Sequence, residues 1–390
     1  MSERRDIGVA VVGFGWMGQV HARAWSRLAQ HYPQIPVRPR FVVVADTDAQ
    51  RRQEAQDAYG FADAVSEWTD VLARDDVDVV SVCGPNFVHR EIGSAVAASG
   101  RHLWIEKPAG RSAEDTAAIA AAVHEAGVRS TVGFNYRHAP AVQVARDLVA
   151  AGALGRLESV DVRMLADYSA HPDQALSWRF DPAFAGTGVL GDLASHGFDL
   201  ALHVGGTMLG GVSELVADQA TYLTERPFPP EGGRSHFARG GDGPRGPVGN
   251  EDTASALLRF SSGARGTLTA SRVAVGEQCG YGFDVRGTEG ALSWDFRRMG
   301  ELRVCLDQDY QDATWETRLV RPGDGDLAAF QPGSGIAMSY DDLKVVECQL
   351  LAHSLLTGQP HGPTIDDAVV AARLVDAMVT SYQEGRWVTP

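Results

Sequence analysis

The sequence predicts an α/β protein with two domains. The first is a doubly wound parallel sheet, and the second is an α/β domain with a large open, mostly antiparallel sheet. Over the first 135 residues, continuous Val/Ile runs alternate with helix-like segments, which is typical of a parallel sheet covered on both faces. A glycine-rich segment follows the first run. After residue 135, strand-like runs are separated by glycine turns, which indicates hairpins.

Composition limits the class of protein further. The chain has 390 residues, of which 44% are hydrophobic, so two domains with real cores are expected. A net charge of −15 argues against nucleic acid or an anionic membrane as partner. The four cysteines form no CxxC pair, which suits a reducing compartment and gives no zinc-knuckle spacing. With no apolar run near the ~18–20 residues that span a bilayer, we expect a cytoplasmic protein without a bound metal.

Five strand-like runs define the expected first domain, residues 1–135. They cover residues 7–12, 41–45, 78–83, 102–106 and 129–134. Ligands of parallel sheets bind at the carboxyl ends of the strands. The residues just past three of these runs are therefore candidates for ligand binding: Asp46, Pro85, Asn86 and Lys107.

A glycine motif, GFGWMG, follows the first strand and opens a helix-like segment. In that context Gly13 permits a tight turn and Gly15 lets the backbone approach a pyrophosphate, while Gly18 lets helix and strand pack closely. The positive end of the helix then faces the anion. This pattern predicts a Rossmann-type dinucleotide site that includes Phe14, Trp16 and Met17.

The acid at the end of the second strand bears on the choice of dinucleotide. Asp46 is placed to accept a hydrogen bond from a ribose 2′-hydroxyl, which favours NAD. It lies further from Gly18 than usual, and the proline-broken stretch 31–40 accounts for the excess. Arg51 or Arg52 could meet a 2′-phosphate, so NADP stays open as the alternative.

Only two of the 35 basic residues are lysines, Lys107 and Lys344. A sequence that otherwise uses arginine keeps a lysine where arginine cannot replace it, because lysine offers a compact ammonium whose pKa responds to burial. Lys107 also follows a predicted strand end, which makes it a candidate for chemistry.

The expected second domain, residues 136–390, begins with a helix at 140–155. Strands are expected at 156–165, 253–260, 264–273, 281–287 and 291–296. Residues 225–250 form a long Gly/Pro-rich loop, a type that is usually a lid, an interface arm or disordered. Helical patterns at 341–357 and 365–384 end the chain, and these helices could pack back on the first domain.

The segment 186–206 carries a stripe of ionisable side chains. Read as a helix, it places four of them on one narrow face, at Asp192, His196, Asp199 and His203. The rest of that helix is mainly apolar, so the stripe is buried and needs partners. Three interpretations stay open: a structural Asp–His pair, a metal site that lacks an evident third ligand, and acid–base catalysis by an imidazole.

Several motifs in one order along the chain resemble the Gfo/Idh/MocA family of oxidoreductases. They are GFGWMG, CGPNFVH, IEKPAG, GFNYRHAP, SWRFDP and GVLGDLASHGFDL. The segments EDTASALLRFSSGARGTLTASRVA and DVRGTEGALSWDFRRMGEL, with ERPFP, are most similar to the branch of inositol and levoglucosan dehydrogenases. The resemblance spans nearly the whole chain.

The resemblance implies a role for each matching residue. The EKP motif of the family matches Glu106-Lys107-Pro108, and its D-x-x-x-H pair matches Asp192 and His196. Further residues are implied at the cofactor: Pro85, Asn86, His89, Glu106, Lys107 and Asn135. Those implied at the substrate are Lys107, Tyr136, Arg137, Trp178, Arg179, Asp192 and His196.

The implied reaction is oxidation of a secondary hydroxyl of a sugar, anhydrosugar or cyclitol, with hydride transfer to NAD. Lys107, His196 and Asp192 are the implied catalytic residues. The open alternatives are an NAD(P)H-dependent ketosugar reductase, a redox-assisted glycosidase and a cofactor-sensing regulator without turnover. The resemblance also implies a homo-oligomer, a dimer or a tetramer, assembled through the open sheet.

Overall fold

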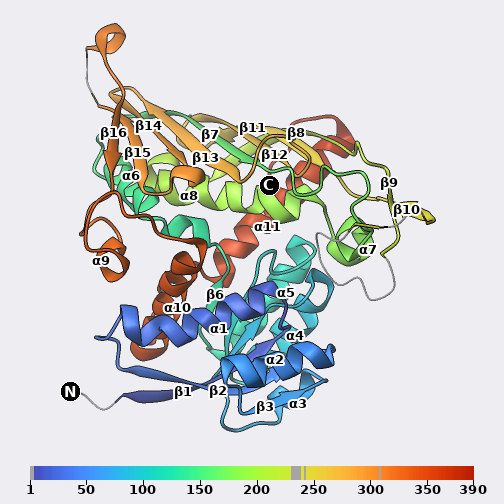
Figure 1. Ribbon diagram of the computed structural model, residues 1–390. Coiled ribbons are helices and arrows are strands. Elements are labelled where there is room, and N and C mark those ends of the chain that lie inside the picture. The colour runs from blue at the N-terminus through green and yellow to red at the C-terminus, as the bar shows by residue number, and fades with distance from the viewer. Residues whose placement is uncertain (1–3, 230–238, 241–242, 307–308) are drawn as a thin grey trace. The chain divides into compact units, whose positions relative to one another are not determined.

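A computed structural model describes residues 4–229, 239–240, 243–306 and 309–390 (Figure 1). The chain divides into two compact units. Unit 1 comprises residues 1–135 and 338–370, and unit 2 comprises residues 136–337 and 371–390. Within the described ranges, no helix is both long enough and apolar enough to cross a membrane.

Unit 1 is built on a six-stranded parallel sheet in the order β3-β2-β1-β4-β5-β6. This is the order of a Rossmann dinucleotide-binding domain, as the sequence predicts. From residue 7 to residue 12 β1 is buried, and so is the whole of β4, as expected for strands covered by helices on both faces. The strands are β1 (Arg5–Val12), β2 (Val37–Ala45), β3 (Asp63–Val65), β4 (Val79–Val82), β5 (His102–Ile105) and β6 (Ser130–Val132).

The second strand begins earlier than the sequence predicts. The stretch 31–40 was expected to be a proline-broken insert, but β2 already starts at Val37 and includes Pro39. Pro39 is tolerated because this half of β2 pairs only with β1, while β3 pairs only with Val43 to Ala45. Pro39 therefore lies where one side of the strand is open, as proline in a sheet requires.

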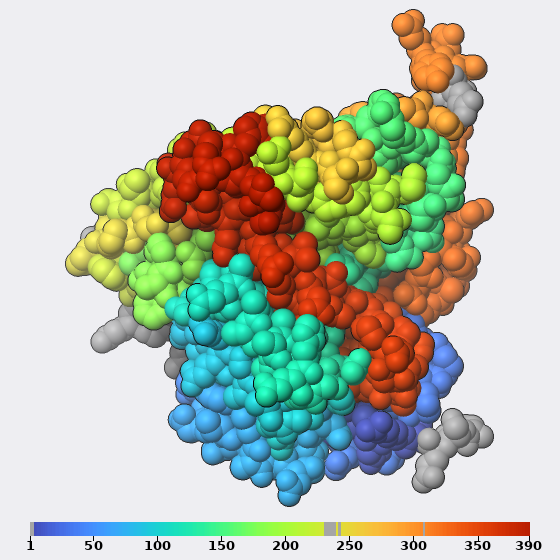
Figure 2. Space-filling model, turned by 180° about the vertical axis from the view of Figure 1, so that it is seen from behind, coloured from blue at the N-terminus to red at the C-terminus, as the bar shows by residue number. Residues whose placement is uncertain are grey.

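The helices of unit 1 include one from the end of the chain. Helix α10 packs on α1, where Arg23 pairs with Asp341 and Arg27 with Asp342. Figure 2 shows the orange-red residues of 338–370 beside the blue N-terminal part of the same unit. The helices are α1 (Trp16–His31), α2 (Ala49–Tyr59), α3 (Thr69–Leu72), α4 (Asn86–Ala98), α5 (Ala113–Ala126) and α10 (Tyr340–Thr357).

Four buried ionisable groups join β5, α1 and α10 inside unit 1. The ammonium of Lys344 lies 2.5 Å from Oε1 of Glu106 and 2.9 Å from Oε1 of Glu347. His21 Nε2 lies 3.0 Å from the same oxygen of Glu106. The Trp104 indole donates to Glu347 at 2.6 Å and stacks on His21. All four charged or titratable side chains are buried, so their mutual contacts replace hydration.

The charge states in this cluster follow from burial and from the neighbours. Burial alone would raise the pKa of Glu106, but the Lys344 ammonium and the His21 hydrogen bond bring it below its usual value. Burial alone would lower the pKa of Lys344, yet the two carboxylates raise it to about 12. Burial lowers the pKa of His21 to about 4, so a neutral ring donates its Nε2–H to Glu106 at pH 7.

Unit 2 is built on an eight-stranded sheet in the order β16-β15-β14-β13-β7-β12-β11-β8. Only β7 and β12 pair in parallel, and the other neighbours are antiparallel, which confirms the predicted open sheet. Its strands are β7 (Leu157–Leu165), β8 (Val212–Ala220), β11 (Thr253–Phe260), β12 (Arg265–Ser271), β13 (Gly280–Gly287), β14 (Gly290–Asp295), β15 (Glu301–Cys305) and β16 (Glu316–Leu319).

Helix α8 lies across one face of this sheet (Figure 1). A Cβ atom at Gly197 would come within 3.0–3.3 Å of Leu268, Met164 and Val162, so the missing side chain permits close packing on β7 and β12. Helix α8 comprises Ser195–Leu209. The other helices are α6 (Pro140–Ala150), α7 (Pro182–Ala185), α9 (Leu327–Phe330) and α11 (Ile365–Glu384), whose first residues belong to unit 1. The 3₁₀ turns are η1 (Asn135–His138), η2 (Trp178–Phe180), η4 (Phe296–Arg298) and η5 (Tyr310–Asp312).

The Gly/Pro-rich stretch 225–250 is described only in part. Two three-residue strands, β9 (Glu225–Pro227) and β10 (Arg245–Pro247), pair antiparallel at its two ends. Residues 230–238 and 241–242 lie outside the described residues. The expectation of a lid or interface arm stays a prediction.

The buried carboxyl of Glu347 gives a prediction for stability against pH. Burial raises its pKa from the usual 4.5 to about 7. Between these values the folded state binds more protons than the unfolded state, so this group reduces stability as pH rises. Glu347→Gln removes the titration. The urea midpoint of the variant minus that of the natural chain should therefore increase as the pH is raised from 4.5 to 7.

The matched control is Glu125→Gln, at an exposed position on α5, which should leave the pH dependence of the urea midpoint unchanged. A difference between Glu347→Gln and the natural chain that stays constant across this pH range would show that Glu347 does not titrate there.

Candidate functional site

The glycine loop of unit 1 has the geometry that a dinucleotide site requires. Gly13 has φ +86°, which L side chains rarely adopt. A Cβ atom at Gly18 would lie 2.2 Å from the carbonyl oxygen of Gly13, so only glycine lets α1 pack this close to β1. At Gly15 a Cβ would meet nothing closer than the Arg51 guanidinium at 3.8 Å. The backbone at Gly15 is therefore open to a ligand.

Two further features fit an anionic ligand with polar groups. Gly15 is the N-cap of α1 and has no side chain, so the cap supplies no acceptor for the first N–H groups of the helix. Asn135 is fully buried, and neither polar atom of its amide has a hydrogen-bond partner among the described residues. A buried amide of this kind needs a partner that a ligand can supply.

Asp46 lies at the end of β2 and closes the glycine loop. Its Oδ2 accepts the Phe14 N–H at 2.6 Å, and its Oδ1 accepts the Asp48 N–H at 2.8 Å. The Arg51 guanidinium lies 3.6 Å from Oδ2, whereas Arg52 donates to the main-chain oxygen of Asp46 at 2.7 Å. Arg52 is thus engaged with the backbone, and Arg51 is the cation that faces the carboxylate.

The aromatic residues of the loop have different surroundings. The Phe14 ring is buried against Tyr59 and Phe61. Trp16 is 63% exposed and stacks on Tyr340 of α10, with ring centroids 5.2 Å apart. The Tyr340 hydroxyl also lies 3.7 Å from the Met17 sulfur. Contact of Trp16 and Met17 with a dinucleotide stays a prediction.

His89 connects two strand ends of unit 1. Pro85 caps α4, which begins at Asn86 and carries His89 in its first turn. His89 Nε2 lies 2.8 Å from the Gly84 carbonyl, and Nδ1 lies 2.9 Å from the Pro108 carbonyl. A neutral imidazole has a single N–H, so only the protonated ring donates to both carbonyls at once. The ring thus lies between the segment after β4 and the segment after β5, within hydrogen-bond distance of both.

The EKP segment follows β5 directly. The carboxylate of Glu106 is buried in the cluster with His21 and Lys344, so its side chain is held inside unit 1. Lys107 is partly exposed, and its peptide bond to Pro108 is cis. The predicted contacts of Glu106 and Lys107 with the cofactor stay predictions.

In unit 2 the predicted ionisable stripe is present, but its helix is not uniform. Residues Leu190–Ala194 form a π-helical turn, η3, that leads into α8. Such turns break the regular α-helical spacing and often occur at functional sites. Asp192 lies in this turn, where its Oδ2 accepts a short hydrogen bond from the hydroxyl of the partly buried Tyr168. Burial and the Asp192 carboxylate raise the pKa of Tyr168 well above its usual value.

The other members of the stripe have separate partners. His196 packs against the Tyr136 ring, with centroids 4.6 Å apart, and Tyr136 in turn contacts Tyr281 and Phe296. Asp199 forms a two-point ion pair with Arg137, in which Nε lies 3.0 Å from Oδ2. His203 lies 3.2 Å from Gln143, and burial lowers its pKa well below 6.5. The half of the stripe with Asp199 and His203 is thus engaged in structural contacts.

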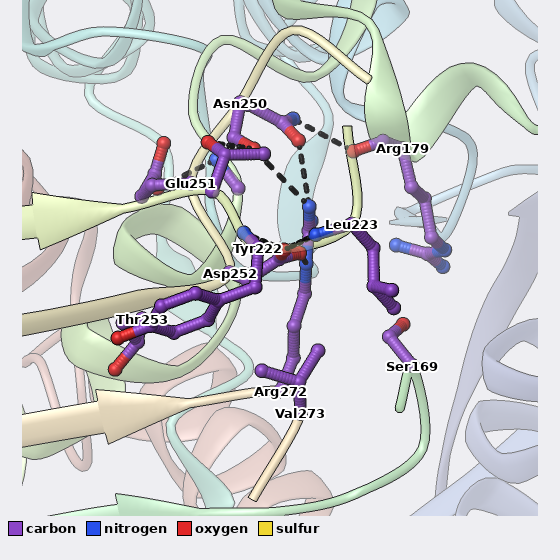
Figure 3. Close-up of polar contacts among 12 residues, drawn as sticks. Ser169, Arg179, Tyr222, Leu223, Asn250, Glu251, Asp252, Thr253, Arg272 and Val273 are labelled. Atoms are coloured by element: carbon purple, nitrogen blue, oxygen red, sulfur yellow. Dashed lines mark hydrogen bonds and ion pairs between the residues drawn. The ribbon is translucent and has the colours of Figure 1, made fainter. Parts of the chain in front are cut away.

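A buried polar cluster supports the turn that carries Asp192 (Figure 3). Oε1 of Glu251 accepts the N–H groups of Gly188 and Leu190 at 2.7 and 2.9 Å. Next to it, Arg272 forms a buried ion pair with Asp252 at 2.9 Å and donates to Asn250. These contacts fix the backbone where η3 begins.

The second predicted substrate segment is joined to the same cluster. Asn250 donates to the main-chain oxygen of Arg179 at 2.8 Å, and the Arg179 guanidinium lies over the Trp178 ring at 4.4 Å. Contact of Trp178, Arg179 and Arg137 with a substrate stays a prediction.

Several residues of these clusters escape sequence reasoning. Glu251 and Asp252 lie within a segment that carries the resemblance, so a signal was present there, whereas Asn250 lies just before it. Tyr168 and His21 stand in ordinary sequence surroundings, and only the tertiary structure brings them to Asp192 and Glu106. The rarity of lysine does single out Lys344, but nothing in the sequence names its partners.

One group of side chains has the donors for a metal ion. The ligand atoms of His21, Glu106 and Glu347 lie within 4.8 Å of one another. The Lys344 ammonium, however, contacts both carboxylates. The carboxylates thus already have a cation, and this donor set does not fit a metal while Lys344 is present.

Comparisons with known proteins agree with this geometry. Residues 7–134 match the family model described as the oxidoreductase family, NAD-binding Rossmann fold, and residues 142–293 match the GFO/IDH/MocA C-terminal domain. The chain is 32% identical to levoglucosan dehydrogenase of Pseudarthrobacter phenanthrenivorans over 98% of both chains. It is 25% identical to inositol 2-dehydrogenase of Rhizobium meliloti over 97% of this chain and 98% of that one.

Solved structures give the same result. A levoglucosan dehydrogenase in complex with NADH and levoglucosan has a TM-score of 0.91 to this chain at 30% identity, with 99% of each chain covered. The complex of a levoglucosan dehydrogenase with NADH and L-sorbose also has a TM-score of 0.91, at 31% identity and the same coverage.

The surroundings of Asp46 predict how the dinucleotide is selected. Asp46→Ala removes the carboxylate expected to bind the ribose hydroxyl and leaves Arg51 next to the loop. The ratio of kcat/KM for NAD to that for NADP should fall about tenfold or more, because a hydrogen bond to a charged group contributes about 1.5–3 kcal/mol. Arg51→Ala should lower NADP use without lowering NAD use. An unchanged ratio in Asp46→Ala would show that this carboxylate does not select the cofactor.

The Tyr168 hydroxyl predicts a second effect. Tyr168→Phe leaves the ring in place but removes the donor to Asp192, so kcat/KM should fall about 10- to 100-fold, the equivalent of one hydrogen bond to a charged group. Tyr222→Phe is the matched control, because this tyrosine is 67% exposed. If Tyr168→Phe is as active as Tyr222→Phe, the Tyr168 hydroxyl is not needed to orient Asp192.

Proposed function

This chain belongs to the GFO/IDH/MocA family of oxidoreductases, and from that membership we propose that it oxidises a secondary hydroxyl of a sugar, anhydrosugar or cyclitol with NAD as the hydride acceptor. The observation that carries the proposal is the similarity, over nearly the full length of both chains, to a levoglucosan dehydrogenase that binds NADH and levoglucosan. An anhydrosugar is therefore the first substrate class to test, with inositols second.

The residues that would hold the dinucleotide lie in unit 1. The open backbone at Gly15 and the N-terminus of α1 suit the pyrophosphate. Asp46 suits the adenosine ribose, and the Asn135 amide offers a buried donor and acceptor to the cofactor. Bound NAD supplies the hydride acceptor, and the protein supplies position and electrostatic stabilisation.

The proton chemistry is assigned to three side chains. When hydride leaves the carbinol carbon, the hydroxyl must lose its proton, and His196 is the general base that accepts it, a role that contributes about 10²–10⁴-fold. The Lys107 ammonium donates to the same oxygen and stabilises its developing negative charge. Asp192, oriented by Tyr168, holds a neighbouring hydroxyl or orients His196.

The aromatic wall around His196 supports this assignment. Tyr136 and Tyr281 lie beside each other and near Phe296. Burial raises the pKa of Tyr281 well above 10, and the neighbouring Tyr136 adds to this effect. The Tyr281 hydroxyl therefore stays protonated. These neutral aromatic rings give a largely apolar surface next to the imidazole, and faces of this kind pack against sugar rings.

The test is formation of NADH, followed by absorbance, with levoglucosan, myo-inositol, scyllo-inositol and glucose as substrates. Lys107→Arg keeps the charge but not the compact ammonium, and it should lose about 10²-fold or more in kcat. His196→Ala should lose a similar factor in kcat with little change in NADH affinity. His124→Ala, at an exposed position on α5, is the control.

Near-normal turnover in Lys107→Arg would refute the role of its ammonium. If NADH affinity collapses in His196→Ala while the rate survives, the imidazole is structural. The absence of NADH with every polyol would refute the substrate class.

We also propose that the protein forms a homo-oligomer through the open sheet of unit 2. The expected dimer or tetramer and the expected cytoplasmic location stay predictions.

A further inference from the structure

The second of the two lysines has no role in the reaction proposed above, yet it is completely buried. Lys344 lies on α10, about 240 residues away from Glu106 in the sequence, and bonds directly to the carboxylate that precedes Lys107. Burial of an ammonium is costly unless paired carboxylates compensate for the lost hydration. Lys344 therefore serves its buried contacts and adds no charge to the protein surface.

The Lys344 ammonium has close contacts with two carboxylates. Its Nζ lies 2.5 Å from one oxygen of Glu106 and 2.9 Å from one of Glu347, and it lies 5.9 Å from the centre of the Trp104 ring. His21 contacts the same oxygen of Glu106. Lysine supplies a compact cation to these carboxylates in a sequence that otherwise uses arginine, whose guanidinium is planar and larger.

Glu106 directly precedes Lys107, so contacts that fix Glu106 also restrict the main chain at Lys107. The Glu106 N–H donates to the Val82 carbonyl at 3.0 Å. A Cβ atom at Gly133 would lie 2.6 Å from either oxygen of the Glu106 carboxylate, so that carboxylate is also held from the side of β6. On the other flank, His89 holds the Pro108 carbonyl. The residues before and after Lys107 are thus both fixed.

We propose that Lys344 is a positioning residue for the Lys107 ammonium, which it acts on through the Glu106 carboxylate. The ion pair neutralises Glu106, so Lys107 does not face an unpaired anion one residue away, and it fixes the backbone from which Lys107 projects. This role rests on the proposed function of Lys107 in the oxidation. A shift of about 1 Å in a catalytic group can cost about 10²-fold in rate.

A double-mutant cycle tests the proposal. Lys344→Met keeps the chain length without the charge, and Glu106→Gln keeps the shape of the carboxylate without its charge. Each should lower kcat about tenfold or more, while KM for NAD changes less than about threefold. The double variant should be no slower than the slower single variant, because both act through one contact. Rates are taken per folded protein, counted by NADH binding.

Arg27→Met is the matched control. It removes another ion pair between α1 and α10, the one to Asp342, without touching Glu106. Its kcat should stay at the level of the natural chain. If Arg27→Met lowers kcat as much as Lys344→Met does, or if the effects of Lys344→Met and Glu106→Gln add, then α10 merely stabilises the fold and the proposal fails.

A measurement without turnover separates this proposal from the proposed function. Reductive methylation with ¹³C-formaldehyde keeps the charge of an amine and labels accessible amines. Lys107 is partly exposed, whereas Lys344 is completely buried. The label should therefore enter Lys107 and the N-terminus, and Lys107→Arg identifies the Lys107 resonance by its loss. The Lys107 resonance should shift in Lys344→Met and in Glu106→Gln and should stay in place in Arg27→Met. An unmoved resonance in folded Lys344→Met would overturn the positioning role, whether or not any polyol is oxidised.

Discussion

The buried ion pair between Glu106 and Lys344 is the contact on which the ligand-facing edge of unit 1 depends. It joins the end of β5 to α10, and His21 extends it to α1. Three elements from opposite ends of the chain therefore meet at one carboxylate oxygen. Breaking a buried pair by removing one partner costs more than the pair itself contributes, because the remaining charge stays buried. The edge of the sheet that carries Lys107 is in this way tied to α10, which lies more than 200 residues later in the chain.

In unit 2, partner side chains likewise hold the ionisable groups in place. The ionisable stripe lies on η3 and α8, where Tyr168 bonds to Asp192 and Arg137 pairs with Asp199. Glu251 holds the turn before η3 through two main-chain N–H groups. The polar groups of this unit are thus fixed before any ligand arrives, which lowers the cost of ordering them during a reaction.

Much of the fold was predictable, because apolar runs and turn glycines are local properties of the sequence. The start of β2 was not, since Pro39 is tolerated only where one side of the strand is open. At the site, Gly13, Asp46 and Lys107 follow strand ends, so a ligand site at that edge of the sheet could be expected. The partners of the ionisable stripe could not be, because Tyr168 reaches η3 and Gln143 reaches α8 only through tertiary packing, and because a π-helical turn changes the spacing of Asp192.

In the proposed reaction, hydride passes from a secondary carbinol carbon of a polyol to the nicotinamide. A substrate deuterated at its carbinol carbons tests this transfer, because NMR at C4 of the nicotinamide follows the label in the NADH that forms. Each NADH produced should carry one deuterium at C4. NADH without deuterium would show that the hydride comes from another source and that the proposed reaction is wrong.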